Sequence, residues 1–323
     1  MQVTSSTDQA LKPTAIALGN FDGIHRGHQK VMESILDAAS GKSSFATVVS
    51  FHPHPREFFT GKSLQLLTPL EEKAQQLNLL GIKQLVLLPF SQKLAIMSPQ
   101  EFVKAILVEQ LQATHISVGE DFRFGNQRRG TIEDLQRIGS QFGIEVIITD
   151  SHHCRGEDGT DPSIRISSSL IREALTQGNI EQANRLLGRA YTLTGKVVEG
   201  QQLGRKIGFP TANLALPPEK FLPRQGVYCV NVSWQTEVGE EFQVNGVMNI
   251  GCRPTVEGTD STVEVHLLNW GGNLYNQEIT VSIAKFVRSE QKFPSLDALK
   301  SQIAADCEVA RKYFLDVLPP LSS

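Results

Sequence analysis

Two histidines three residues apart follow a short apolar run in the segment ALGNFDGIHRGHQ, residues 17–29. The pattern predicts a strand, a turn and a helix start, so that His25 and His28 share one face of the first helical turn. A helix N-terminus offers free N–H groups, and imidazole N–H groups donate to phosphate oxygens. Gly19 lets the backbone approach a ligand, and Gly27 allows tight packing of the helix start. The segment favours phosphate binding, with a glycine-rich turn carrying two solvent-facing histidines as the alternative.

A Walker-type phosphate loop does not occur in the sequence. The tripeptide GKS stands at 41–43 and at 61–63, but neither copy has a glycine five residues before it. If the chain binds ATP, it must therefore do so with other residues.

A second glycine-rich segment, TGKVVEGQQLGRKIGFPTANL (194–214), runs between two strand-like stretches. Main-chain N–H groups at Gly204 and Gly208 can approach a phosphate as in an anion-binding nest, and Lys206 adds positive charge. Thr211 and Asn213 offer a hydroxyl and an amide carbonyl, which are oxygen ligands suited to Mg²⁺. Pro–Thr turns are common, so PTAN alone is weak evidence for a Mg²⁺ site. The glycines that precede it strengthen that interpretation.

An alternating segment, TVEVHLLNW (262–270), predicts a strand with Glu264 and His266 on one face. A carboxylate beside Mg-ATP can act as a general base that takes a proton from a hydroxyl group. The residues alone favour the alternative, a strand glutamate that faces solvent.

Three further loops carry side chains that suit a planar or phosphorylated ligand. SFHPHPREFF (50–59) is a rigid proline loop, and a metal site there is disfavoured because no third ligand is evident by spacing. VGEDFRFGNQRRG (118–130) places Phe122 and Phe124 where they can stack on a ring, with a solvated basic loop as the alternative. RISSSLIREAL (165–175) predicts a serine-capped helix with Arg172 one turn inside, where it can reach phosphate or lie on the surface.

The elements that must position these residues change character along the chain. In the first half, β-rich runs alternate with helical stretches, which predicts βαβ units and a parallel sheet with ligands beyond its carboxyl edge. The strands are expected at 14–18, 44–51, 84–90, 114–119 and 144–150. After a helical linker at 167–188, short and close-spaced strands predict an antiparallel barrel or sandwich. A final helix with an apolar stripe and Ser295 as its cap is expected to pack on the core.

Composition limits the class of protein. The net charge of −3 argues against a dedicated nucleic-acid binder. No apolar run reaches the roughly 18–20 residues of a membrane span, and the N-terminus does not read as a signal peptide. The 4 cysteines lie far apart without a CxxC pair, which disfavours a structural zinc site or a disulfide scaffold. We expect a reduced, cytoplasmic protein.

Several of these segments, in this order, resemble the bifunctional riboflavin kinase/FAD synthetases of bacteria. GNFDGIHRGHQ is similar to the HxGH signature of nucleotidylyltransferases, and RISSSLIREAL and GFPTAN are similar to two further family motifs. The resemblance implies a Rossmann-like nucleotidylyltransferase domain, a parallel sheet with flanking helices, at 1–187. It implies an antiparallel six-stranded β-barrel riboflavin kinase domain with a C-terminal helix at 188–323.

The resemblance also implies roles for individual residues. Catalytic roles fall on Glu264, His25, His28 and Arg172. ATP-binding roles fall on Gly19, Asn20, Asp22, Gly27, Ser168, Ser169, Gly204, Lys206 and Gly208. Flavin-binding roles fall on Phe51, Pro53, Arg56, Asp121, Phe122 and Arg288. Thr211 and Asn213 are the expected Mg²⁺ ligands.

The expected reactions use two ATP and Mg²⁺. Riboflavin is phosphorylated to FMN in the second domain, and FMN is adenylylated to FAD in the first, releasing pyrophosphate. Departures from the family pattern at Asp121, Glu199 and Asn269 leave a single-activity enzyme as an alternative. A flavin- or nucleotide-sensing protein is the non-enzymatic alternative. The expected partners are small molecules, with no nucleic acid and no membrane, and weak self-association is a further possibility.

Overall fold

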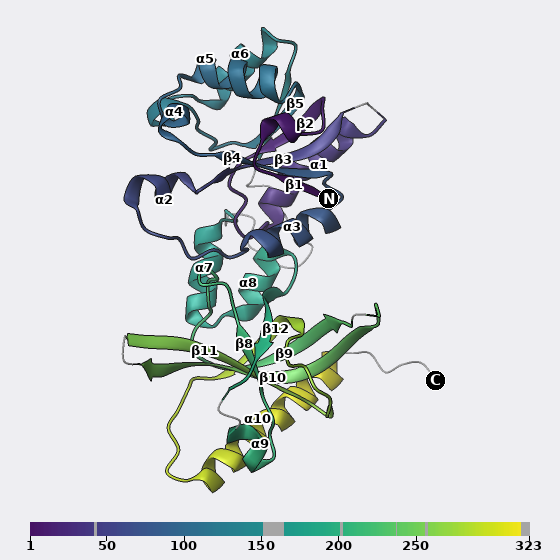
Figure 1. Cartoon of the computed structure of the whole chain (residues 1–323), viewed down its shortest axis with the longest axis vertical. Coiled ribbons are helices and arrows are strands. Elements are labelled where there is room, and N and C mark those ends of the chain that lie inside the picture. The colour runs from purple at the N-terminus through teal and green to yellow at the C-terminus, as the bar shows by residue number, and fades with distance from the viewer. Residues whose placement is uncertain (42–43, 151–164, 201–202, 237, 256–257, 318–323) are drawn as a thin grey trace. The chain divides into compact units, whose positions relative to one another are not determined.

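The computed structural model describes residues 1–41, 44–150, 165–200, 203–236, 238–255 and 258–317. The chain divides into two compact units, Met1–Ser168 and Ser169–Ser323 (Figure 1). The division falls before the boundary expected between residues 187 and 188. The reason is that helix α8 (Ile180–Leu187) packs with the strands that follow it: Asn184 Nδ2 donates to the main-chain oxygen of Ile283, 2.9 Å away.

The first unit contains a six-stranded sheet in the order β1-β4-β3-β2-β5-β6, and its paired strands are parallel. Its strands are β1 (Gln2–Thr4), β2 (Thr14–Leu18), β3 (Phe45–His52), β4 (Gln84–Pro89), β5 (Ala113–Gly119) and β6 (Glu145–Thr149). The five predicted strands are present. The edge strand β1 was not predicted, because three residues are too few to show a period.

Strand β2 is buried on both faces of this sheet. Ile16 and Leu18 belong to one core cluster, whereas Ala15 and Ala17 belong to another. Alternate side chains of a strand point to opposite faces, so helices must cover the sheet on both sides. The helical segments of this unit are η1 (Thr7–Gln9), α1 (Arg26–Ala39), α2 (Pro55–Thr60), α3 (Leu70–Leu79), α4 (Gln92–Ala95), α5 (Pro99–Glu101), the π-helix η2 (Phe102–Gln110), η3 (Asn126–Arg128) and α6 (Ile132–Ser140).

The second unit is built on a closed six-stranded barrel in the order β10-β11-β8-β7-β12-β9, with antiparallel pairing. Its strands are β7 (Tyr191–Val198), β8 (Ala212–Ala215), β9 (Gly226–Gln235), β10 (Glu241–Thr255), β11 (Gly258–Leu267) and β12 (Glu278–Arg288). The predicted barrel is confirmed. A short helix, α9 (Leu203–Ile207), lies within the segment that was expected to be a glycine-rich loop.

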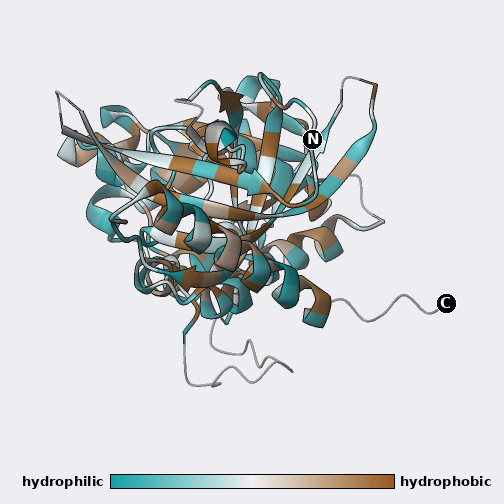
Figure 2. Cartoon of the chain, turned by 90° about the horizontal axis from the view of Figure 1, so that it is seen from below, coloured by the Kyte–Doolittle hydropathy of each residue, from teal (hydrophilic) through white to brown (hydrophobic). Residues whose placement is uncertain are grey.

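Two further helical regions follow the predictions with one difference. The expected linker helix is two helices, α7 (Ser168–Gln177) and α8, broken at Gly178, whose φ is +81°. The final helix, α10 (Leu296–Val317), is capped as predicted, since the N–H of Ala298 donates to Ser295 Oγ, 3.2 Å away. Its buried residues Cys307 and Ala310 join the barrel core. Figure 2 shows hydrophobic and hydrophilic residues alternating along the helices, as one-sided burial requires.

Among the described helices, none combines the length and the apolar character that a membrane crossing requires.

Candidate active sites

The loop after β2 lies where the strand order of the first sheet reverses, because β3 pairs with one side of β2 and β5 with the other. In parallel sheets such a switch point forms the crevice in which ligands bind. Phe21 and Ile24 in this loop have positive φ angles of 48° and 43°, which are uncommon outside glycine. Both side chains are buried, so core packing holds the turn in this conformation.

His25 and His28 lie together at the start of α1, as their spacing predicts. Their rings are stacked with centroids 3.5 Å apart. His25 is the N-cap residue of α1, and its Nδ1 accepts from the main-chain N–H of His28 at 3.3 Å. When the His25 imidazole is neutral, its proton is therefore on Nε2. His28 Nδ1 is buried and, among the described residues, has no hydrogen-bond partner.

Asn20 and Asp22 are fixed by neighbouring elements. Asn20 Nδ2 lies 2.9 Å from His54 Nε2, in the loop after β3. Asp22 Oδ1 accepts from the N–H of Thr68 at 3.1 Å, and the main-chain oxygen of Asp22 accepts from Ser168 Oγ at 2.7 Å. The structure thus gathers Asn20, Asp22 and Ser168 with the histidine pair. Ser169 lies in the second unit and is exposed.

A lysine that the sequence analysis missed lies at the same loop. Lys73, on α3, donates from Nζ to the main-chain oxygen of Asn20 at 2.8 Å. Although part of its side chain is exposed, the ammonium is desolvated and its pKa is lowered, while the charge of Asp22 acts to raise it. The available signal was a lysine in the first turn of a helix, where the dipole disfavours a cation.

Two histidines of this site, His28 and His54, are uncharged near neutral pH, because their pKa values are lowered. Burial lowers the pKa of His28 well below 6.5, and the positive charges of His25 and Lys73 lower it further. Burial also lowers the pKa of His54, although Glu57 opposes the shift. His28 and His54 are therefore neutral at pH 7, where each can donate one hydrogen bond.

Five of the six expected flavin-binding residues lie at or just after the ends of two strands of the first unit, β3 and β5. Phe51 contacts Phe90 edge to face, Pro53 is exposed on the adjoining loop, and Arg56 is exposed on α2. Asp121 forms an ion pair with Arg165.

The loop that follows β5 offers fewer aromatic rings than expected. Phe124 is 5% exposed and belongs to the core, so the prediction that it stacks on a ligand is wrong. Phe122 is partly buried and lies parallel to Phe124, with centroids 5.8 Å apart.

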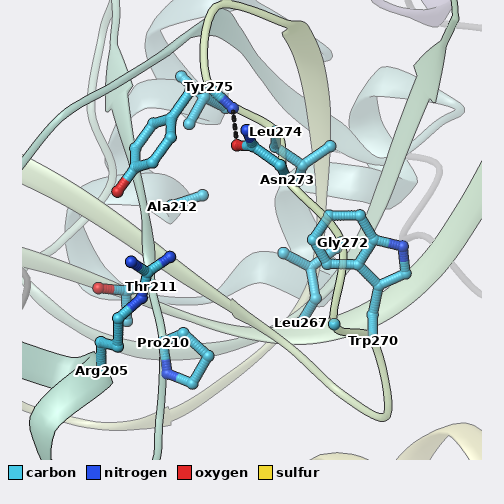
Figure 3. Close-up of a pocket in the computed structure, with 12 residues that line it drawn as sticks. Arg205, Pro210, Thr211, Ala212, Leu267, Trp270, Gly272, Asn273, Leu274 and Tyr275 are labelled. Carbon is cyan, nitrogen blue, oxygen red and sulfur yellow. Dashed lines mark hydrogen bonds between the residues drawn. The ribbon is translucent and has the colours of Figure 1, made fainter.

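In the second unit, Thr211 lines a pocket of about 360 Å³ (Figure 3). Arg205 of α9 and the segment after β11 complete it, and Figure 3 shows Trp270 on the side opposite Arg205 and Thr211. The pocket therefore brings the PTAN segment together with the residues that follow Glu264 in the sequence.

Asn213 on β8 is the register partner of Glu264 on β11. Directly paired residues of antiparallel strands project from the same face, so their side chains are neighbours. The next same-face residue of β11, His266, lies 2.8 Å through Nδ1 from the main-chain oxygen of Pro210 and so ties the PTAN segment to β11.

The glycines before PTAN are placed where a side chain would not fit. A Cβ at Gly200 would lie 2.3 Å from Asn213 Nδ2, and one at Gly204 would lie 2.3 Å from the main-chain oxygen of Phe209. The segment thus covers Asn213 closely. Gly208 has a φ of +90°, and the side chain of Lys206 lies outside the described part of the structure.

Two arginines expected to bind ligands make contacts within the second unit. The Arg172 guanidinium lies over the ring of Phe221, 4.8 Å from its centroid. Arg288 forms an ion pair with the buried carboxylate of Asp306 on α10, with a shortest N–O distance of 2.7 Å. Their assignments to phosphate and to flavin stay predictions.

Among the described residues, no three or more histidine, cysteine or acidic side chains gather in a way that could hold a metal. A Mg²⁺ ion bound to a nucleotide needs fewer protein ligands, because phosphate oxygens and water complete its shell. The oxygen donors of Thr211 and Asn213 beneath the close-fitting glycine segment suit that role.

Family models for FAD synthetase and riboflavin kinase match residues 7–163 and 187–314, respectively. The bifunctional riboflavin kinase/FMN adenylyltransferase of Escherichia coli (strain K12) is 39% identical over 300 residues, covering 93% of this chain and 92% of the relative. The enzyme of the same name from Pseudomonas fluorescens is 39% identical over 91% of each chain. A solved structure from Streptococcus pneumoniae, described as a macrolide-efflux protein, is similar over 96% of this chain and 98% of its own, with a TM-score of 0.82 and 31% identity. The chain belongs to the family of bifunctional riboflavin kinase/FMN adenylyltransferases.

Proposed function

We propose that the first unit transfers the adenylyl group of ATP to FMN at the N-terminus of α1. The observation that carries this assignment is that one end of the buried Asn20 amide and the Nδ1 atom of His28 lack hydrogen-bond partners among the described residues. A phosphate oxygen of FMN attacks the α-phosphorus of ATP, the bond to the bridging oxygen breaks, and pyrophosphate leaves. The site positions the phosphates and neutralises their charge, and no enzyme nucleophile is needed.

The second unit phosphorylates riboflavin at the face shared by Asn213 and Glu264. Their register pairing carries this assignment, because it sets the Glu264 carboxylate beside the amide oxygen of Asn213, two residues after Thr211. Glu264 takes the proton of the ribityl 5′-hydroxyl, whose oxygen attacks the γ-phosphorus of ATP. FMN forms and ADP leaves.

Thr211 and Asn213 hold Mg²⁺ in this proposal. The ion, when bound, offsets negative charge that the phosphates carry in the transition state. Glycine at 200 and 204 keeps the main chain close to these ligands, and Glu264 acts from the opposite strand.

The remaining assignments keep the status of predictions. Phe51, Pro53, Arg56, Asp121, Phe122 and Arg288 are proposed to contact flavin, and Arg172 to contact phosphate. We further propose that the enzyme acts in the cytoplasm, which the unpaired thiols of Cys229, Cys252 and Cys307 support. Its partners are small molecules rather than nucleic acid or membrane, with weak self-association.

The test is a time course of the purified chain with riboflavin, ATP and Mg²⁺, with the flavins separated by chromatography. FMN that rises before FAD is expected. A second reaction with supplied FMN isolates adenylyl transfer. FMN as the final product would contradict the role of the histidine pair, and bound flavin without any product would favour a sensing protein.

A further inference from the structure

Asn20 is held from two sides by residues of two other segments. Lys73 of α3 donates to its main-chain oxygen at 2.8 Å, and His54 Nε2 lies 2.9 Å from its side-chain Nδ2. Neither contact belongs to the hydrogen bonds that build the sheet or α1. The two contacts therefore serve to fix the position of one residue in the loop after β2.

The hydrogen bonds of His54 decide which end of the Asn20 amide faces it. His54 Nδ1 accepts from the main-chain N–H of Arg56 at 3.0 Å. A neutral imidazole that accepts at Nδ1 carries its proton on Nε2, so Nε2 donates. A donor requires an acceptor, and only the oxygen of the Asn20 amide can accept. The two ends of an amide have nearly the same shape, so the hydrogen-bond pattern is what assigns them.

Turning the Asn20 amide also resolves its unpartnered oxygen. With nitrogen toward His54, Oδ1 is buried and has no partner among the described residues. With oxygen toward His54, that atom is satisfied, and the NH₂ group takes the open position. The loop then holds a buried N–H donor that lacks an acceptor, and a phosphate oxygen is an acceptor of the kind that the start of α1 attracts.

Placing the Lys73 ammonium at this loop costs free energy of desolvation. Its ammonium is desolvated, and burial disfavours its charged form despite the charge of Asp22. The desolvation of this ammonium opposes folding, so a purely structural role does not account for it. An anion bound at the loop would offset the desolvation. The same charge lowers the pKa of His28 and of His54, so the three groups are electrostatically coupled.

We propose that Lys73 and His54 are positioning residues for adenylyl transfer, which hold Asn20 so that its side-chain N–H donates to a phosphate oxygen of the nucleotide. This inference rests on the proposed adenylyl-transfer site in the first unit. It adds two residues, from α3 and from the loop after β3, to those that the sequence motifs suggested.

The first experiment compares Lys73→Met, Lys73→Arg and Lys83→Met in the full chain. Lys83 is an exposed lysine just before β4, at the other end of the strands, and serves as the matched control. We expect Lys73→Met to lower kcat for FAD formation from FMN by about 100-fold, as loss of a preorganised charge does. Lys73→Arg restores part of the rate, and Lys83→Met has no effect.

Two readouts separate positioning from a purely structural role. Thermal unfolding of the first unit is expected to occur at the same or a higher temperature in Lys73→Met, because a desolvated charge is removed. Histidine resonances followed by NMR are expected to show higher pKa values for His28 and His54 in that variant. Wild-type activity in Lys73→Met overturns the proposal, as does a loss of activity that follows a loss of stability in both Lys73 variants.

The second experiment tests the donor directly with Asn20→Asp. The variant keeps the shape and the acceptor for His54, but it replaces the N–H donor with a second oxygen. We expect at least a tenfold rise in the KM for ATP and weaker binding of pyrophosphate by calorimetry. Unchanged values overturn the assignment of a donor. If His28→Ala also leaves FAD formation unchanged, the proposed site itself is wrong, whereas an inactive His28→Ala confines the failure to this inference.

Discussion

Arg288 of β12 and Asp306 of α10 form a two-pronged ion pair that fastens the final helix to the barrel. Both Nε and Nη2 of Arg288 donate to the carboxylate, and Gln302 Nε2 donates to it at 2.9 Å. Asp306 is 3% exposed, so the carboxylate depends on these partners. The residue expected to contact flavin thus has a structural partner as well.

Asp306→Asn is predicted to lower the stability of the second unit by about 2–3 kcal/mol, because the Arg288 charge loses its partner in a largely buried site. Scanning calorimetry of the full chain measures this as a shift of the barrel transition. Glu308→Gln removes the exposed pair with Arg311 on the same helix and is expected to change stability by under about 1 kcal/mol. Equal shifts in the two variants would contradict the structural role of the buried pair.

Glu264→Gln is predicted to lower riboflavin phosphorylation by about 100-fold or more, because the amide cannot accept the hydroxyl proton. FAD formation from supplied FMN is expected to stay at the wild-type rate, since that reaction belongs to the first unit. Glu278→Gln, at an exposed position at the start of β12, is the control. Loss of both activities in Glu264→Gln would show that the sites are not independent.

His28→Ala is predicted to have the opposite effect. FAD formation is expected to fall by about 100-fold, because one donor to the transferring phosphate is lost, and FMN formation is expected to persist. The two rates come from the same time course, so phosphorylation serves as the internal control. Unchanged FAD synthesis would contradict the role proposed for His25 and His28 in adenylyl transfer.

The stability of the first unit is predicted to depend on pH below neutrality. The folded-state pKa values of His28 and His54 lie below 6.5, so between those values and 6.5 the unfolded chain binds more protons. Stability is therefore present above pH 6.5 and is lost as the pH falls, by at most about 1.4 kcal/mol per pH unit for each histidine. Thermal unfolding at pH 7.5 and 5.5 checks the sign, and His28→Ala is expected to flatten the dependence. A first unit that becomes more stable at pH 5.5 would contradict the desolvation of these rings.

Local features of the chain determined the fold class and much of both sites. The alternation of β-rich and helical stretches sufficed for the parallel sheet, and the close-spaced strands sufficed for the barrel. The spacing of His25 and His28 placed both rings at one helix start, because residues three apart in a first turn are neighbours. The period of two in TVEVHLL likewise put Glu264 and His266 on one face of β11.

Contacts between distant segments were decided only by the tertiary structure. Lys73 reaches Asn20 because α3 packs beside the loop after β2, and no spacing in the sequence encodes that approach. The partner of Glu264 depends on the register between β8 and β11, and a shift of one residue would turn Asn213 to the other face. Phe124 carries the same local signal as Phe122, yet burial in the core removes it from any site. Sequence patterns report the period of an element, whereas packing decides which residues of different elements meet.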